Sequence, residues 1–245
     1  MKRKTRIVVF FLIIVIGIGI PVEKNIHDNS NVKFADENMG RVIRNTLWGF
    51  PGETTIEEIT YKEIRKIDSL DIGYSGYYTT LSDLRYCTEL KELIINGGID
   101  KNAPAYYINQ GKVNKENTPE DMRKLQQELE EVLPKLKKLE RVMLSSWGGE
   151  TWSSLDFFKG CEKLEYVDIS RCEATDYSVL KSCKSLKKIE IGHSDIAHAD
   201  DLIGLENIES ILIYDAPLGD NPNEVKKLQE TYPNADISCT GNKFP

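Results

Sequence analysis

Histidine is scarce in this chain, and the motifs of common catalytic and metal sites are missing. The 245 residues include three histidines, of which His193 and His198 are five positions apart and His27 stands alone. A five-residue spacing fits neither metal binding from one helix face nor a known catalytic motif. The five cysteines form no C-x-x-C pair and no Cys/His set with zinc spacing, and the chain has no G-x-S-x-G and no glycine-rich phosphate loop. The sequence therefore predicts no enzyme, no catalytic residue, no metal ion and no cofactor.

Positive charge is also in short supply. The formal net charge is −7, from 32 basic and 39 acidic residues. Four of the basic residues, Lys2, Arg3, Lys4 and Arg6, precede the first acidic one, so the chain beyond Pro21 has 28 basic against 39 acidic residues and a charge of −11. Nucleic-acid binding depends on basic side chains that neutralise phosphates. The balance therefore predicts no nucleic-acid partner.

The N-terminal residues are typical of an export signal. The four cations precede an unbroken apolar run from Ile7 to Ile20. This run is shorter than the ~18 apolar residues of a membrane-spanning helix, yet Gly19-Ile20-Pro21-Val22 is a poor cleavage site. A cleaved signal peptide and a retained N-terminal membrane anchor therefore both stay open. We expect the remainder of the chain to be extracellular or at the cell surface, either released or tethered by its N-terminus.

A short apolar phrase of the pattern L-x-x-L-x-L recurs along the chain, and its last copies are 25, 22 and 22 residues apart. Apolar residues also recur nine, six and three places before the phrases. Three-residue spacing cannot belong to a strand, so it predicts a short helical or 3₁₀ turn. Each unit thus has apolar residues on its strand and on its back turn. A single unit cannot bury both sets, which means that the units must stack side by side. The phrases are Leu90–Ile95, Leu139–Leu144, Leu164–Ile169, Leu186–Ile191 and Ile208–Ile213.

These repeats resemble those of bacterial cell-surface leucine-rich repeat proteins, the internalin-like group with 22-residue units, from about Phe34 to the C-terminus. The segments Phe34-Ala-Asp-Glu-Asn and Ile67-Asp-Ser-Leu70-Asp-Ile72 are similar to the cap and first strand of that family. The resemblance implies an α/β leucine-rich repeat solenoid with a curved parallel sheet on the concave side and a helical N-terminal cap. It also implies a protein or peptide ligand more often than a sugar. The chain departs from the family's usual Asn after each strand, having Ser75, Gly98, Trp147, Cys172, Ser194 and Ala216 there.

The period is interrupted at the start and in the middle of the chain. Asp36 can cap a helix that ends near Gly49, and Thr118-Pro119 predicts the start of a second helix with one apolar face. The loop from Asp100 to Asn117 either projects and contacts a partner or simply leads into that helix. The expected divisions are a signal peptide or N-terminal anchor at 1–22, a linker at 23–33, a helical cap at 34–66 and the repeat domain at 67–245, with an insertion at about 97–133.

The cysteines follow the repeat. Cys87, Cys161 and Cys183 each stand three residues before a phrase, in a slot that Leu occupies in other units. Each is therefore expected to behave as a small buried hydrophobic side chain with a free thiol. Cys161 and Cys183 would stack in adjacent units, so a disulfide between them stays open.

Function is expected on the strand residues that lie between the buried positions. A solvated face has no use for the apolar and aromatic residues found there, and their mixture with charged residues is typical of a protein interface. Two plainer explanations stay open, because strand propensity alone favours Tyr and Ile, and Trp147 or Trp152 can belong to the core. We therefore predict a non-catalytic binding module, with an envelope spacer or an inhibitor or immunity-type partner of a co-exported protein as alternatives. The predicted ligand-binding residues are Ile94, Arg141, Met143, Trp147, Tyr166, Asp168, Glu190, Leu212 and Tyr214.

Overall fold

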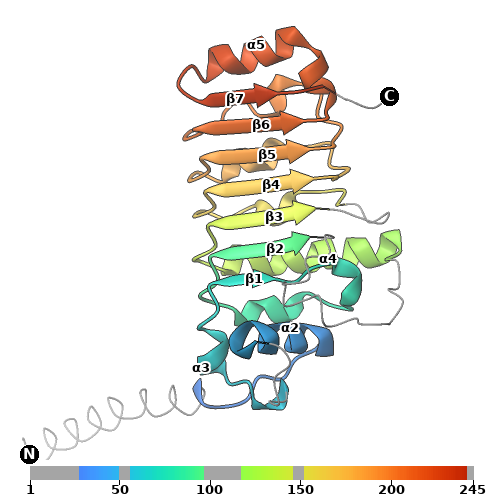
Figure 1. Ribbon diagram of the computed structural model, residues 1–245, viewed down its shortest axis with the longest axis vertical. Coiled ribbons are helices and arrows are strands. Elements are labelled where there is room, and N and C mark those ends of the chain that lie inside the picture. Colours follow the sequence, from blue (N-terminus) through green and yellow to red (C-terminus); the bar gives the residue numbers. More distant parts are fainter. Residues whose placement is uncertain (1–27, 50–55, 97–116, 146–151, 242–245) are drawn as a thin grey trace, which may run out of the picture.

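Seven strands form one open, parallel sheet in which every strand pairs with its neighbours in the chain (Figure 1). The computed structural model describes residues 28–49, 56–96, 117–145 and 152–241. The strands stack as a ladder along the long axis, and the helical segments lie behind the ladder or at its two ends (Figure 1). The strands are β1 (Ser69–Asp71), β2 (Glu92–Asn96), β3 (Arg141–Ser145), β4 (Tyr166–Ser170), β5 (Lys188–Gly192), β6 (Ser210–Tyr214) and β7 (Asp236–Cys239).

The apolar phrases become the strands and their buried rows. Val142, Val167 and Ile189 are register partners on successive strands, and each is fully buried. The same holds for Leu144, Ile169 and Ile191, which are at most 1% exposed. Side chains alternate along a strand, so the residues between these positions lie on the other face of the sheet. The predicted fold class, an α/β leucine-rich repeat solenoid with a parallel sheet and a helical N-terminal cap, is confirmed.

Short 3₁₀ turns return the chain behind the sheet, as the three-residue spacing predicted. Their apolar residues point into the core; Leu84, Phe158, Leu180 and Leu202 are all fully buried. The 3₁₀ segments are η1 (Ile56–Glu58), η2 (Ser75–Tyr77), η3 (Ser82–Tyr86), η5 (Leu133–Lys135), η6 (Asp156–Phe158), η7 (Ser178–Ser182), η8 (Ala199–Asp201) and η9 (Pro217–Asp220).

The N-terminal end of the ladder is covered by helix α2 (Glu37–Trp48) together with α3 (Tyr61–Ile64). Asp36 is the N-cap of α2, accepting a hydrogen bond from the backbone N–H of Met39 at 3.1 Å, as predicted. Its other carboxylate oxygen accepts from the backbone N–H of Thr79 at 2.7 Å. The buried Asp83 carboxylate accepts from the backbone N–H groups of Ala35 and Asp36, both at 2.8 Å. Two carboxylates thus join the cap to the first repeat.

Helix α4 (Pro119–Val132) replaces a short back turn and lies behind the sheet at the level of β2 (Figure 1). Thr118 and Asp121 form a reciprocal capping box at its start, which confirms the predicted N-terminus. The helix buries one apolar stripe, also as predicted, and packs against η3, η5 and η6. Gln126 is 6% exposed and its side-chain carbonyl accepts from the backbone N–H of Ser153 at 2.7 Å, which fixes the chain after β3.

Helix α5 (Pro222–Thr231) and β7 close the other end, as the sequence predicted. The Tyr232 hydroxyl donates to the carbonyl of Leu202 at 2.7 Å and accepts from the backbone N–H of Gly204 at 2.9 Å, so the end of α5 is held to the preceding unit. None of the helices in the described part of the chain is both long and apolar enough to traverse a lipid bilayer.

All five cysteines have free thiols, and four of them are buried. Burial raises the pKa of Cys161 to about 12 and that of Cys183 to about 11, so both thiols stay protonated at neutral pH. Of the residues in the slot after each strand, Ser75, Cys172, Ser194 and Ala216 are buried, whereas Gly98 and Trp147 lie outside the described residues. Trp152 is 1% exposed and belongs to the core.

Candidate functional site

One face of the sheet carries the candidate site. The buried rows pack against the back turns and helices, whereas no described helix lies in front of the strands in Figure 1. We call this uncovered side the open face. It has three rows of register partners: a first row of Ser69, Glu92, Arg141, Tyr166, Lys188, Ser210 and Asp236; a middle row of Asp71, Ile94, Met143, Asp168, Glu190, Leu212 and Ser238; and a third row that includes Ser145, Ser170, Gly192 and Tyr214.

The structure brings together eight of the nine residues that the sequence singled out. Five of the strands supply them, and they are contiguous across β2 to β6. The ninth, Trp147, lies outside the described residues. The eight are Ile94, Arg141, Met143, Tyr166, Asp168, Glu190, Leu212 and Tyr214.

Tyr166, in the first row, is only 8% exposed although it stands on the open face. The Arg141 guanidinium lies 4.4 Å from the centre of its ring, and the Lys188 ammonium lies 5.4 Å from it. Both distances suit cation–π interaction. Arg141 also donates to the Glu92 carboxylate at 2.9 Å, which in turn accepts from the Ser69 hydroxyl at 2.7 Å. The first row is therefore a connected set of side chains whose positions are fixed before any ligand arrives.

Asp168 and Glu190 are register partners in the middle row, so two carboxylates lie side by side on adjacent strands. Glu190 pairs with the Lys188 ammonium at 2.9 Å. Asp168 accepts a hydrogen bond from the Ser170 hydroxyl at 3.1 Å, and no ion pair within the described residues involves it. Burial and then the charge of Glu190 raise the pKa of the Asp168 carboxyl, although the Ser170 hydrogen bond and the charge of Lys188 oppose them. Half-exposed apolar side chains flank the two carboxylates, Met143 on one side and Leu212 on the other.

Tyr214, in the third row, reaches across its neighbour Gly192. Its hydroxyl lies 2.8 Å from the Ser170 hydroxyl, two strands away, and its ring packs edge-on against His193 with centroids 5.4 Å apart. A Cβ on Gly192 would overlap the Tyr214 ring. Glycine in a strand often marks such a close approach. Here the missing Cβ of Gly192 leaves room for the Tyr214 ring to lie across the strand.

Gly192→Ala is therefore expected to displace the Tyr214 ring and break its hydrogen bond with Ser170. We expect the free energy of unfolding to fall by about 1–2 kcal/mol, from a lost hydrogen bond plus overpacking. Chemical denaturation measures the change. In a Tyr214→Ala background the same glycine substitution should cost less than about 0.5 kcal/mol, and an undiminished cost there would contradict this role of Gly192.

The raised pKa of Asp168 predicts an unusual pH dependence. Its folded-state pKa lies above the unfolded value, so between these two values the folded protein binds more protons than the unfolded chain. Asp168 therefore makes the protein lose stability as pH rises through this window from the unfolded value of about 3.9. Asp168→Asn removes this contribution. Paired urea titrations from pH 4 to 7 should show the variant gaining stability relative to wild type as pH rises, and a difference that is constant or of the opposite sign would disprove the assignment.

Sequence reasoning missed the residues that organise this surface. Strand alternation places Glu92, Lys188, Ser170 and Gly192 on the same face as the predicted residues, but they were not among the predicted ligand-binding residues. One signal in the sequence could have indicated this organisation, namely Gly192. Glycine weakens a strand, so its presence there often marks a close approach by another group. The ring contacts of Tyr166 depend on which side chains stand beside it on β3 and β5, and a linear pattern does not contain that information.

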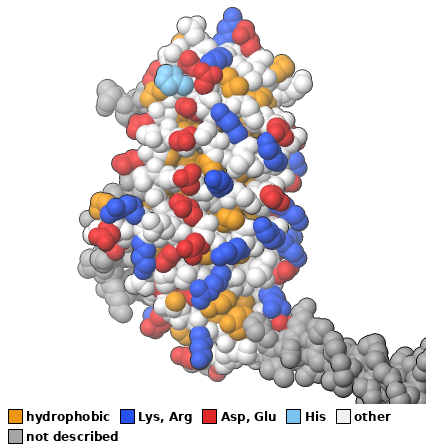
Figure 2. Space-filling model, turned by 180° about the vertical axis from the view of Figure 1, so that it is seen from behind, with side chains coloured by type: hydrophobic (Ala, Val, Ile, Leu, Met, Phe, Trp, Pro, Cys, Tyr) orange, Lys and Arg blue, Asp and Glu red, His pale blue; other side chains and the backbone are white. Residues whose placement is uncertain are grey.

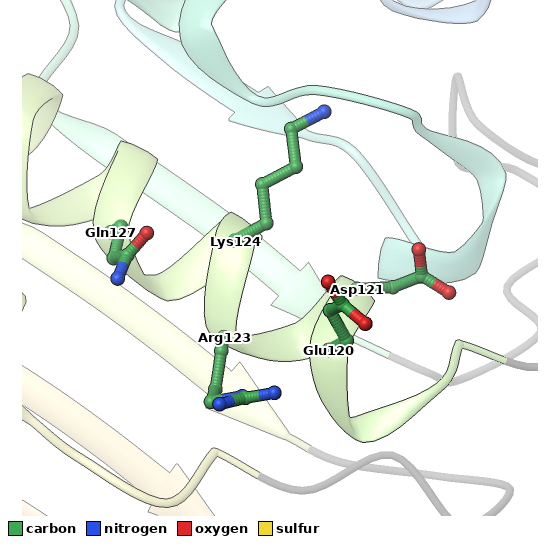
Figure 3. A pocket seen from close by; sticks show the side chains of 5 residues that line it. All are labelled: Glu120, Asp121, Arg123, Lys124 and Gln127. Atoms are coloured by element: carbon green, nitrogen blue, oxygen red, sulfur yellow. The ribbon is translucent and has the colours of Figure 1, made fainter.

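A second hollow, of about 450 Å³, lies over the first turns of α4 (Figure 3). Its lining is polar and of mixed charge, with Lys124 pointing toward the neighbouring backbone, where it donates to the carbonyl of Thr79 at 2.8 Å. The lining residues that the structure describes all come from this helix: Glu120, Asp121, Arg123, Lys124 and Gln127. None of these described lining residues is apolar, so the open face, with Ile94, Met143 and Leu212, is the stronger candidate.

The open face carries charged, aromatic, hydroxyl and apolar side chains. In the described part of the chain, no cluster of three or more His, Cys, Asp or Glu side chains could hold a metal ion. The functional groups of the three rows instead form ion pairs, ring contacts and hydrogen bonds with one another. On the back of the molecule, acidic and basic side chains are interspersed, with hydrophobic areas between them (Figure 2).

Comparison with known proteins gives only a distant likeness. No protein-family model matches the chain, and no curated protein matches it either. Among solved structures, internalin C2 of Listeria monocytogenes is similar at 14% identity and a TM-score of 0.36, over 84% of this chain and 94% of that one. An internalin, InlF, of the same organism gives 14% and 0.32, over 85% and 76%. TLR13 in its complex with ssRNA13 gives 17% and 0.43, over 76% and 28%. The class, a leucine-rich repeat solenoid, therefore rests on the parallel ladder and its repeat register.

Proposed function

We propose that this protein is an exported, non-catalytic binding module that recognises a protein or peptide ligand on the open face. Export is supported by the four cations and the apolar run at the N-terminus, with release or tethering of the chain as its two outcomes. The extracellular side or the cell surface is accordingly the proposed location. The proposed ligand-contacting residues are the eight described ones named above, together with Trp147.

One observation carries the proposal. Ile94, Met143 and Leu212 are half-exposed in a single row, beside charged and aromatic side chains that are already held by one another. A surface whose side chains are fixed in advance loses little conformational entropy on binding, so a few apolar anchors can dominate the affinity. Tyr166 is 8% exposed, so it offers a ligand little apolar area, and its main proposed contribution is to position Arg141 and Lys188.

The test is selection of peptides from a random display library on the exported protein, followed by binding measurements on variants. Met143→Ser combined with Leu212→Ser removes two anchors without changing charge. We expect the selected peptides to bind this variant at least about tenfold more weakly, because two buried anchors are lost.

A matched control exists on the back of the solenoid. Val179→Ser combined with Ile203→Ser also removes two half-exposed apolar side chains, from the segments around η7 and η8. This control should bind the selected peptides within about twofold of wild type. Equal loss in both variants, or no loss in the open-face variant, would refute the proposal.

A further inference from the structure

We infer that the open face selects an extended partner segment in which a Lys or Arg side chain is flanked, two residues away on each side, by apolar side chains, and that Asp168 receives the cation. This inference rests on the proposed function and adds the class of ligand and a residue that determines specificity. It follows from the charges of the three rows, from the partners of each charged group and from the spacing of the strands.

The charge of the open face is complementary to a cation. Its rows contain five acidic residues but only two basic ones. Both basic residues are engaged, because Arg141 bonds to Glu92 and Lys188 bonds to Glu190, while both also contact the Tyr166 ring. The acidic residues are Asp71, Glu92, Asp168, Glu190 and Asp236.

Asp168 is the carboxylate that a ligand can best use. It stands at the centre of the middle row, next to Glu190, and the Ser170 hydroxyl is the only hydrogen-bond donor that the described residues provide to it. Asp168 is half-buried, has the like charge of Glu190 beside it and forms no ion pair with the described residues, which is electrostatically costly. The charge of Lys188, which pairs with Glu190, offsets this cost only in part. An incoming ammonium or guanidinium group removes part of this cost, so binding and charge compensation favour each other.

The spacing of the middle row fits an extended chain that crosses the strands. Adjacent strands are about 4.8 Å apart, so the midpoint between Asp168 and Glu190 is about 7 Å from Met143 and about 7 Å from Leu212. Side chains on one face of an extended peptide repeat about every 6.7 Å, that is, every second residue. If residue i of the peptide is apolar and lies over Met143, residue i+2 lies between the two carboxylates. Residue i+4 then lies over Leu212.

Side chains of the first and third rows border the middle row on its two sides, so we expect the peptide segment to lie along the middle row. On one side, Tyr166 is covered by Arg141 and Lys188. On the other side, the Tyr214 ring crosses Gly192 and bonds to Ser170. The half-exposed groups between these two barriers are Met143, Asp168, Glu190 and Leu212.

The experiment uses the exported protein and a fluorescein-labelled peptide, Ser-Gly-Leu-Ser-Arg-Ser-Leu-Gly-Ser, with binding followed by fluorescence anisotropy. Two comparison peptides carry citrulline in place of arginine, which keeps the shape but not the charge, or the contiguous order Leu-Arg-Leu, which breaks the spacing. We expect each comparison peptide to bind at least about tenfold more weakly than the parent, as a charge-assisted contact and an apolar anchor are lost in turn.

Asp168→Asn should make the parent and citrulline peptides bind equally. Asp236→Asn removes one negative charge from an exposed position of the same face on β7, and it should leave the preference intact. The preference should weaken with added salt, since it is electrostatic.

The outcomes separate this inference from the proposed function. If the citrulline peptide binds as well as the parent, if Asp168→Asn keeps the preference, or if the parent does not bind, the inference is overturned. In each of these cases the library selection still decides the proposed function, through the loss of binding by the Met143→Ser and Leu212→Ser variant. A melting temperature of Asp168→Asn that is not lower than that of wild type shows that the loss of preference is an effect on binding and not on folding.

Discussion

Phe157→Ala is expected to lower the free energy of unfolding by about 3–5 kcal/mol, the largest loss expected from any single substitution considered for this protein. Phe157 is fully buried in η6, where its ring centre lies 4.8 Å from that of Phe158 and 5.9 Å from that of Trp152. Helix α4 packs over η6, so truncation of this ring leaves a cavity between the helix and the repeat core. Denaturation followed by the fluorescence of the neighbouring Trp152 measures the loss directly.

Val179 is the matched control, because it occupies the same slot of the next unit, one residue before the buried Leu180. No long helix covers that unit in the described structure, and Val179 is half-exposed. Val179→Ala should therefore cost less than about 1 kcal/mol. Similar losses for the two substitutions would contradict the placement of α4 over η6.

Asp83→Ala is expected to cost about 2–3 kcal/mol and to loosen the N-terminal cap. Asp83 is fully buried, and one of its oxygens accepts both backbone N–H groups at the start of α2. Removal of the carboxylate leaves the buried backbone N–H of Asp36 and the partly buried one of Ala35 without this acceptor. Asp83→Asn retains an accepting oxygen and should lose less. Burial is the main cause that raises the pKa of Asp83, which means that a neutral side chain is well tolerated at this position.

Asp201 provides the control for this substitution, since it fills the same slot in a unit far from the N-terminal cap and is half-exposed. Asp201→Ala should change the free energy of unfolding by less than about 0.5 kcal/mol. Hydrogen exchange of the α2 amides should rise sharply in Asp83→Ala and stay unchanged in Asp201→Ala. Unchanged exchange in both variants would show that Asp83 does not hold the cap.

The repeat architecture could be predicted because the buried positions recur. Leu164, Val167 and Ile169 belong to a phrase that is repeated in neighbouring units, and equal spacing brings equal residues into register. Local chemistry was equally informative at helix ends. Asp36 and the pair Thr118-Pro119 cap helices for reasons contained in a few adjacent residues, so both starts were predicted correctly.

The burial of Phe157 and Asp83 could not be predicted in the same way. Their slot faces outward in an ordinary unit, and Val179 and Asp201 show that exposure. It becomes buried only where α4 or the N-terminal cap lies over it. These covering contacts join segments that are far apart in the sequence, and no period of 22 residues encodes them.

The candidate site was predictable in its membership but not in its organisation. Alternation along the strands identified Met143, Asp168 and Leu212 as neighbours on one face. The same alternation suggested two equivalent aromatic anchors, whereas Tyr166 is covered by two cations and Tyr214 lies across Gly192. The half-exposed apolar and acidic groups of the middle row are therefore the surface on which we expect a ligand to act.

Methyl-labelled NMR spectroscopy of the exported protein, titrated with a peptide selected on it, tests the central claim most directly. The account predicts that the methyl signals of Ile94, Met143 and Leu212 shift on binding, while those of Val179 and Ile203 on the back of the solenoid do not. Shifts confined to Val179 and Ile203, with the open-face methyl groups unchanged, would contradict it.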